Sequence, residues 1–269
     1  MTQQAPFTAA HRKALEQALL DTFIAMDREI ARPDHSPWID IYKVRELLFR
    51  FWSNRNQKVD TGYIFTLNQD LWLERNLSNQ LAYTAGSLSL PGLERRSDQQ
   101  IFITNIGHFC DQLVMKANEN SATGSRLAGQ FNVIKLHGWF NWQSADGSSA
   151  MVVGAQKKSQ VESSLLLAWH FEIFRRVLSA GDVRLMIVGY GFGDEHVNAA
   201  IADAVLHHGL KVFIWNTDSN LRNCVLGAPH GADIWAGLLS TAKQQMIDVF
   251  PENQAETQEY IRIRTTFFG

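Results

Sequence analysis

Three short segments place polar residues where hydrophobic runs end, two of them with glycines, and they carry the side chains best suited to chemistry. They are 63–74 (YIFTLNQDLWLE), 133–142 (VIKLHGWFNW) and 185–198 (LMIVGYGFGDEHVN). In an open parallel sheet, ligands bind at the carboxyl ends of the strands. We therefore expect the amide of Asn68, the imidazole of His137 and the glycine-rich turn after Val188 to line one nucleotide-sized pocket.

Two of these segments have both a functional and a structural interpretation. Asn68 and Asp70 follow a predicted strand and could hold ribose hydroxyls or orient a water. Alternatively, Asp70 caps the following helix and Asn68 satisfies turn amides. His137 has an ordinary pKa near 6.5 that suits a general base at neutral pH, although a histidine at a strand end can also be structural. Gly138 after it would let a ligand approach the backbone.

The third segment joins a predicted strand to the N-terminus of a predicted helix. Glycines permit close approach and a helix N-terminus favours phosphate, although the spacing is not that of the GxGxxG fingerprint. Asp194 is expected to cap the helix, whereas His196 and Asn198 could simply be surface residues. Asp194, Glu195 and His196 do not form an HExxH motif, so no metal is expected.

Hydrophobic periodicity predicts an α/β chain with a mostly parallel sheet. The predicted helices are 8–30, 39–52, 70–80, 163–178 and one that ends at Gly209. The predicted strands are 62–67, 101–105, 132–137, 151–153, 183–188 and 210–215. We expect strands 62–67, 132–137, 183–188 and 210–215 to lie parallel in one sheet. Segments 84–99 and 116–130 are expected to be loops, and Trp139, Phe140 and Trp142 to form a packed aromatic turn.

Composition narrows the function classes. The net charge of −2 and the pI near 6.5 give no electrostatic case for nucleic acid or an anionic membrane. The longest apolar runs fall short of a membrane span, and the polar segment 1–13 lacks the apolar core of a signal peptide. Cys110 and Cys224 are too few for a disulfide framework, so a cytoplasmic location is expected.

Taken in order, these segments resemble the motifs of sirtuin-like domains. TLNQDLWLE is similar to their T-x-N-x-D-x-x-L-E motif, and KLHG is similar to their K-L-H-G motif. VGYGFGDEHVN resembles the G-Y-x-F-x-D-x-H-x-N form, which is typical of the bacterial branch used in anti-phage defence. FIWN, residues 213–216, resembles the strand whose terminal asparagine meets the adenosine ribose. The resemblance covers roughly residues 60–220.

This resemblance implies a helical region at 1–58 and a Rossmann-type, NAD-binding domain at 59–269, with helices on both faces of its sheet. The implied reaction breaks the bond between nicotinamide and ribose in NAD, without a metal. Asn68 would orient water or the ribose, Asp70 would support that site, and His137 would be the base. The implied NAD-binding residues are Thr66, Gly189, Tyr190, Gly191, Asp194 and Asn216. A homo-oligomer or a partner defence protein is expected to control such an activity.

The chain departs from the family pattern in one place. The family opens with a strand and a Gly-Ala-Gly-x-Ser loop that cradles the dinucleotide, whereas residues 1–60 contain no glycine. We therefore expect residues 1–55 to be helical, no strand before residue 60, and a cleft that is open on that side. The alternative function is a catalytically silent binding or scaffold module within a larger complex. Protein deacylation is disfavoured because the zinc-ribbon cysteines are absent.

Overall fold

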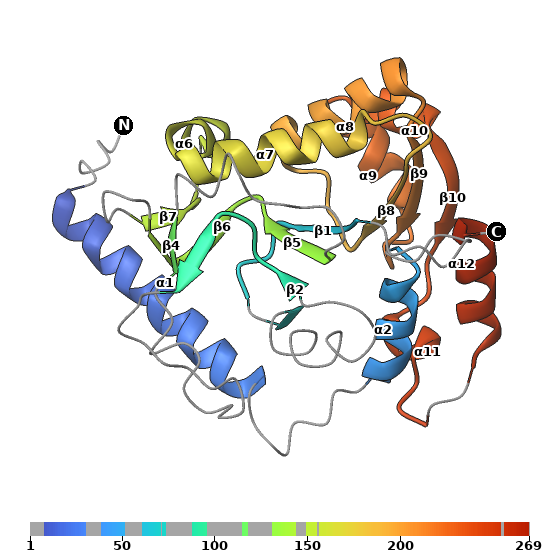
Figure 1. The fold of residues 1–269 in the computed structure, drawn as a ribbon, viewed down its shortest axis with the longest axis horizontal. Coiled ribbons are helices and arrows are strands. Elements are labelled where there is room, and N and C mark those ends of the chain that lie inside the picture. Colours follow the sequence, from blue (N-terminus) through green and yellow to red (C-terminus); the bar gives the residue numbers. More distant parts are fainter. Residues whose placement is uncertain are drawn as a thin grey trace, which may run out of the picture.

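The computed structural model describes residues 8–30, 39–51, 61–70, 72–73, 88–95, 115–117, 131–143, 149–154, 156–253 and 256–268. Its helices are α1 (Ala9–Ile30), α2 (Ile41–Phe49), α6 (Lys157–Ser163), α7 (Leu165–Leu178), α8 (Glu195–His208), α9 (Leu221–Gly227), α10 (Gly231–Ala236), α11 (Met246–Val249) and α12 (Gln258–Phe268). Its strands are β1 (Gly62–Thr66), β2 (Leu88–Ser89), β3 (Leu93–Arg95), β4 (Met115–Ala117), β5 (Phe131–Lys135), β6 (Gly138–Gln143), β7 (Ser149–Met151), β8 (Arg184–Val188), β9 (Lys211–Trp215) and β10 (Leu238–Ala242). The mixed α/β class is confirmed (Figure 1).

Two small parallel sheets carry the strands that precede the candidate site residues. In the first, β5 lies between β1 and β2, and Thr66 of β1 pairs with Lys135 of β5. In the second, β9 lies between β8 and β10, and Val188 of β8 pairs with Trp215 of β9. Because the paired strands run parallel, the polar residues that follow them emerge at a common edge of each sheet.

The prediction that the four principal strands share one sheet is wrong for the described strands. Among these, β1 pairs with β5 alone and β8 pairs with β9 alone. Side-chain packing joins the two sheets instead, since Ile134 of β5 and Ile214 of β9 belong to one buried cluster with residues of α7 and α8. The hydrophobic pattern that marks these strands as buried therefore says nothing about which of them pair.

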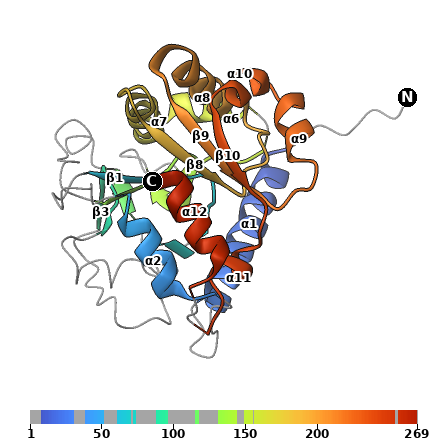
Figure 2. The same ribbon diagram turned by 90° about the vertical axis from the view of Figure 1, so that its right-hand side faces the viewer.

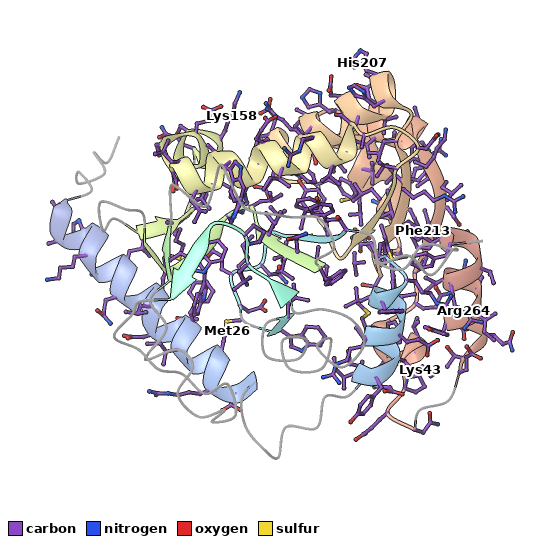
Figure 3. The ribbon with its side chains drawn as sticks, in the orientation of Figure 1. Met26, Lys43, Lys158, His207, Phe213 and Arg264 are labelled. Atoms are coloured by element: carbon purple, nitrogen blue, oxygen red, sulfur yellow. The ribbon has the colours of Figure 1, made fainter. Side chains whose placement is uncertain are left out.

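The second sheet is covered by helices on both faces, as predicted for the sheet as a whole (Figure 2). Val212 and Ile214 point into the cluster shared with α7, α8 and α10. Phe213 and Trp215 alternate with them and point into a second cluster with α2 and α12. Figure 3 shows Phe213 on the side of the sheet that faces α2 and α12. A strand buried on both faces reads as a continuous apolar run, as KVFIW does.

Several local predictions require correction. The expected aromatic turn at Trp139 and Trp142 is strand β6, which pairs antiparallel with β7 and parallel with β4. The helix expected at 163–178 is confirmed as α7, which begins two residues later because the hydroxyl of Ser164 accepts from the amide of Leu167 at 3.4 Å and caps it, whereas the preceding helix α6 was not predicted. Parts of the expected loops 84–99 and 116–130 form strands β2, β3 and β4.

Other predictions fall partly or wholly outside the described residues. Helices α1 and α2 agree with the helical character expected for the N-terminal region, in so far as that region is described. The predicted strand at 101–105 lies outside the described residues, as does most of the helix expected at 70–80. Within the described part of the chain, no helix has the length and apolar character needed to cross a membrane.

Candidate active site around His137 and His196

His137 lies in the turn between β5 and β6, and its side chain is 4% exposed. Gly138 after it has a φ of 66°, a conformation that favours glycine. A Cβ atom there would lie 1.8 Å from the backbone oxygen of Ala150. The interpretation that Gly138 leaves room for a ligand is therefore wrong, because β7 occupies that space.

The segment that follows β1 is tied directly to His137. The side-chain amide of Gln69 donates to the carbonyl oxygen of Val152 at 2.7 Å and to that of His137 at 3.3 Å. The amide of Leu136 also donates to the carbonyl oxygen of Thr66 at 2.9 Å. These contacts hold segment 66–69, in which Asn68 is exposed, against the turn that carries His137.

The hydrogen bonds of this segment also support its structural interpretation. Oδ1 of Asp70 accepts from the backbone amide of Trp72 at 2.8 Å, which is the capping role considered from the sequence. The hydroxyl of Thr66 accepts from the amide of Asn68 at 3.0 Å. The buried ammonium of Lys135 donates to the carbonyl oxygen of Asp70. Hydrogen bonds to the amide of Asn68 and to the side chain and carbonyl oxygen of Asp70 thus fix this segment.

A second histidine completes the cluster. Nε2 of His196 lies 3.5 Å from Nε2 of His137, and its side chain is 8% exposed. Its ring also contacts the ring of Phe171, with the centroids 5.3 Å apart. The interpretation of His196 as a surface residue is wrong. Its spacing from Ala200 and Ala204, both buried in α8, was the signal that could have placed it on the inner face.

Asp194 and Lys157 form an ion pair beside the two imidazoles. Oδ1 of Asp194 lies 2.7 Å from Nζ of Lys157, and the aspartate side chain is 11% exposed. Asp194 occupies the N-cap position of α8 as predicted, but its side chain makes no capping hydrogen bond. Its carboxylate is instead committed to Lys157 at the edge of the site.

Burial keeps both imidazoles neutral at physiological pH. Loss of solvation lowers the pKa of His137 to about 4, against the opposing effect of Asp194 and with smaller lowering effects from Lys157 and His196. Burial likewise lowers the pKa of His196, again opposed by Asp194. A pair of neutral imidazoles can share one hydrogen bond, in which one Nε2 donates and the other accepts.

The glycine-rich loop after β8 is held by a buried network. The phenol oxygen of Tyr190 lies 2.9 Å from Oδ1 of Asn198 and accepts from the amide of Asp194 at 3.2 Å. The amide of Asn198 donates to the carbonyl oxygen of Phe192 at 2.8 Å. Asn198 is fully buried, which corrects its interpretation as a surface residue, and burial raises the pKa of Tyr190. Tyr190 is thus a structural member of the loop.

The glycines of this loop leave space above the backbone. Gly189 has a φ of 64°, and a Cβ atom at Gly189, Gly191 or Gly193 would meet no atom within 4 Å. In contrast to Gly138, no neighbouring element of the described chain requires these glycines. Open space over exposed backbone at the carboxyl end of a parallel strand is the arrangement in which phosphates or ribose approach.

Asn216 ties the loops after β8 and β9 together. Its side-chain amide donates to the carbonyl oxygen of Tyr190 at 3.0 Å, and its Oδ1 accepts from the amide of Asp218 at 2.9 Å. Its backbone amide donates to the carbonyl oxygen of Ala242 at 2.9 Å, next to the end of β10. Hydrogen bonds of Asn216 therefore join the residues that follow β8 and β9 to the end of β10.

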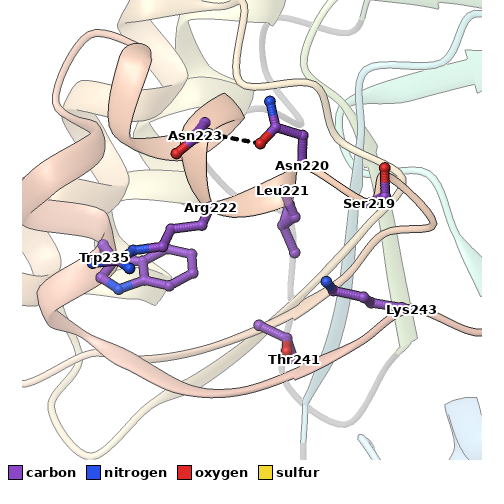
Figure 4. Close-up of a pocket in the computed structure, with 8 residues that line it drawn as sticks. All are labelled: Ser219, Asn220, Leu221, Arg222, Asn223, Trp235, Thr241 and Lys243. Carbon is purple, nitrogen blue, oxygen red and sulfur yellow. Dashed lines mark hydrogen bonds between the residues drawn. The ribbon is translucent and has the colours of Figure 1, made fainter.

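A pocket of about 360 Å³ opens at the carboxyl ends of β9 and β10 (Figure 4). It lies beyond Asn216 and its partner Ala242, and no motif among its lining residues marks it in the sequence. Arg222 and Lys243 give it positive charge and Trp235 gives it an aromatic wall. The lining residues are Ser219, Asn220, Leu221, Arg222, Asn223, Trp235, Thr241 and Lys243.

Comparisons with known proteins do not assign this chain to a family. No protein-family model matches the chain, and no curated protein matches it at a significant level. Among the described residues, no group of three or more histidine, cysteine, aspartate or glutamate side chains is placed to hold a metal ion. The class of site that the geometry defines is a polar cluster at the carboxyl ends of parallel strands, centred on two buried imidazoles.

Proposed function

We propose that this chain is an NAD+ hydrolase with a Rossmann-type, sirtuin-like domain that cleaves the bond between nicotinamide and ribose. The observation that carries the proposal is the contact of segment 66–69, which includes Asn68, with the turn that carries His137, made through Gln69 and Thr66. An amide and a neutral imidazole at the carboxyl ends of paired parallel strands are the groups that the sirtuin-like motifs assign to the reacting centre.

In the proposed reaction, the nicotinamide–ribose bond breaks and its electron pair leaves with nicotinamide. Water oriented by Asn68 then adds to the oxocarbenium-like carbon, and the proton of the water passes to His137. A neutral imidazole can accept that proton. Burial lowers the pKa of His137 to about 4, in place of the ordinary value near 6.5 expected from the sequence, so the imidazole is neutral at pH 7 and a weaker base than an ordinary histidine. Holding the water in the right geometry lowers the entropic part of the activation barrier, which is a large part of such catalysis.

The NAD-binding part of the proposal uses the second sheet. Backbone N–H groups near Gly189 and Gly191 would approach the phosphates, over the space that these glycines leave open. The adenosine end would extend past Asn216 toward the pocket that contains Trp235, Arg222 and Lys243. An aromatic wall suits the adenine base, and the two cations can donate hydrogen bonds to its ring nitrogens and to the ribose hydroxyls. Control of the activity by an oligomer or a defence partner belongs to the same proposal.

A catalytically silent binding module is the second candidate function. It is favoured by the hydrogen bonds that already occupy Asp70, Thr66 and the amide of Asn216 in structural roles. The two candidates differ in one measurable product. Purified protein that releases nicotinamide from NAD+ is a hydrolase, whereas protein that binds NAD+ without releasing nicotinamide is a binding module.

A further inference from the structure

The contact between His137 and His196 has two chemically different forms. Both rings are buried and burial lowers the pKa of each, so the two Nε2 atoms, 3.5 Å apart, share a hydrogen bond when one carries the hydrogen and the other offers its lone pair. The form decides which nitrogen of His137 remains available, because the hydrogen bond at one ring nitrogen fixes the tautomer of the whole imidazole.

The position of His196 favours its neutral form. It lies in the first turn of α8, two residues after Asp194, where the partial positive charge of the helix N-terminus disfavours an imidazolium. A neutral histidine there can offer the lone pair of Nε2. Its ring packs against the ring of Phe171 of α7.

Only one form leaves His137 able to act as a base. If His196 donated its hydrogen, Nε2 of His137 would be occupied as an acceptor and Nδ1 would carry the hydrogen. If His137 donates, its Nδ1 keeps a free lone pair. Within the described part of the chain, Nδ1 of His137 has no hydrogen-bond partner that would compete with a substrate.

We propose that His196 is a positioning residue whose Nε2 accepts the Nε2 hydrogen of His137, so that His137 presents Nδ1 as the proton acceptor. When Nδ1 takes a proton, the imidazolium keeps its hydrogen bond to His196, and the carboxylate of Asp194 balances the new charge. The ammonium of Lys157 lies 2.7 Å from the carboxylate of Asp194 and partly neutralises the negative charge that Asp194 offers to the imidazolium. The role assigned to Nδ1 rests on the proposed hydrolase function, whereas the direction of the hydrogen bond can be measured without turnover.

The direction is tested by correlation spectroscopy of protein labelled with ¹⁵N in its histidines, at pH 7. His137→Gln and His196→Gln identify the two sets of signals. We expect His137 to carry its hydrogen on Nε2 and His196 to carry its hydrogen on Nδ1. The opposite tautomers, or a rapid equal mixture of the two, would overturn the proposal whether or not the protein cleaves NAD+.

The kinetic arm compares His196→Leu with His196→Gln. Leucine removes the acceptor, whereas the amide oxygen of glutamine can still accept from Nε2 of His137. We expect His196→Leu to lower kcat for nicotinamide release by roughly 10- to 100-fold, the loss typical when the partner that orients a histidine is removed. We expect KM to change little, and His196→Gln to recover most of the rate.

His207→Leu is the matched control, because His207 is an exposed histidine near the end of the same helix, paired with Asp203 (Figure 3). It should leave kcat and KM unchanged. Equal losses for His196→Leu and His196→Gln in folded protein, or wild-type rates for both, would contradict the positioning role. If His196→Leu does not fold, the wild-type tautomers still test the direction of the hydrogen bond. The rate of nicotinamide release by His196→Gln then tests the positioning role. If the wild type releases no nicotinamide, the proposed function fails, and the tautomers alone decide the direction.

Discussion

The phenol oxygen of Tyr190 lies 2.9 Å from Oδ1 of Asn198, and this contact fastens the glycine-rich loop to the first turns of α8. Both residues belong to the third sequence motif, and Asn198 is fully buried. The motif is therefore partly a structural device that fixes the loop backbone.

Tyr190→Phe should lower the free energy of unfolding by about 1–3 kcal/mol, because it leaves the buried Oδ1 of Asn198 without its donor. Urea denaturation measures the change. Tyr42→Phe is the control, since Tyr42 is 62% exposed and should change stability by less than about 0.5 kcal/mol. Equal effects of the two substitutions would show that the Tyr190 contact is not stabilising.

Gly138→Ala should lower stability, whereas Gly191→Ala should lower the affinity for NAD+. Alanine at 138 places its Cβ against the backbone of β7 and strains a positive φ, so we expect a loss of about 3 kcal/mol or more. Alanine at 191 meets nothing within 4 Å, so stability should hold while NAD+ affinity falls. Thermal unfolding and calorimetric titration separate the two effects. Unchanged NAD+ affinity in Gly191→Ala would contradict the approach of the dinucleotide to this loop.

His170 should make stability depend on pH. It is fully buried, its Nε2 contacts the carbonyl oxygen of Pro91 at 2.8 Å, and burial lowers its pKa to about 4 from the ordinary 6.5. Between these values the unfolded chain binds a proton that the folded chain does not. The contribution of neutral His170 to the free energy of unfolding is therefore fully present above pH 6.5. It is lost as the pH falls toward 4, by roughly 3 kcal/mol.

His170→Gln keeps a donor for Pro91 but does not titrate, so its stability should vary less over the same pH range. Urea denaturation at several pH values between 4 and 7 provides the comparison. His137 and His196 also have lowered pKa values, so the variant should retain part of the dependence. A pH profile identical to that of the wild type would exclude His170 as a contributor.

The charged pocket beyond Asn216 should contribute to dinucleotide binding. Substituting both Arg222 and Lys243 by alanine removes its two cations and should raise KM for NAD+ by about tenfold, if each charge-assisted contact contributes modestly. Lys211→Ala is the control, because Lys211 is exposed at the opposite end of β9. An unchanged KM in the double variant would place the adenosine end elsewhere.

Local patterns in the sequence predicted the principal strands and α8 to within a few residues. Continuous apolar runs mark β5, β8 and β9, and Asp194 and Gly209 mark the two ends of α8. Gly209 has a φ of 70°, the left-handed conformation that commonly ends helices. These features depend on neighbouring residues alone, which is why the sequence suffices to find them.

Tertiary relationships could not be predicted in the same way. The separation of β1 and β8 into two sheets depends on strand pairing, which hydrophobic periodicity does not encode. The contact of His137 with His196 joins residues 59 positions apart. The alternative role of Asp70 as a cap could be read from the sequence and agrees with the structure, whereas the contact with the second imidazole and the structural role of Tyr190 could not be read from it.

The most direct test of the account is nicotinamide release from NAD+ by purified wild-type protein, measured beside His137→Ala and Asn68→Ala. We expect the wild type to release nicotinamide, and each substitution to lower the rate by roughly 10²- to 10⁴-fold, because His137 is the proposed base and Asn68 orients the water. Melting temperatures of the same samples show whether each variant is folded. Wild-type protein that binds NAD+ but releases no nicotinamide, or folded His137→Ala that turns over at the wild-type rate, would contradict the hydrolase assignment.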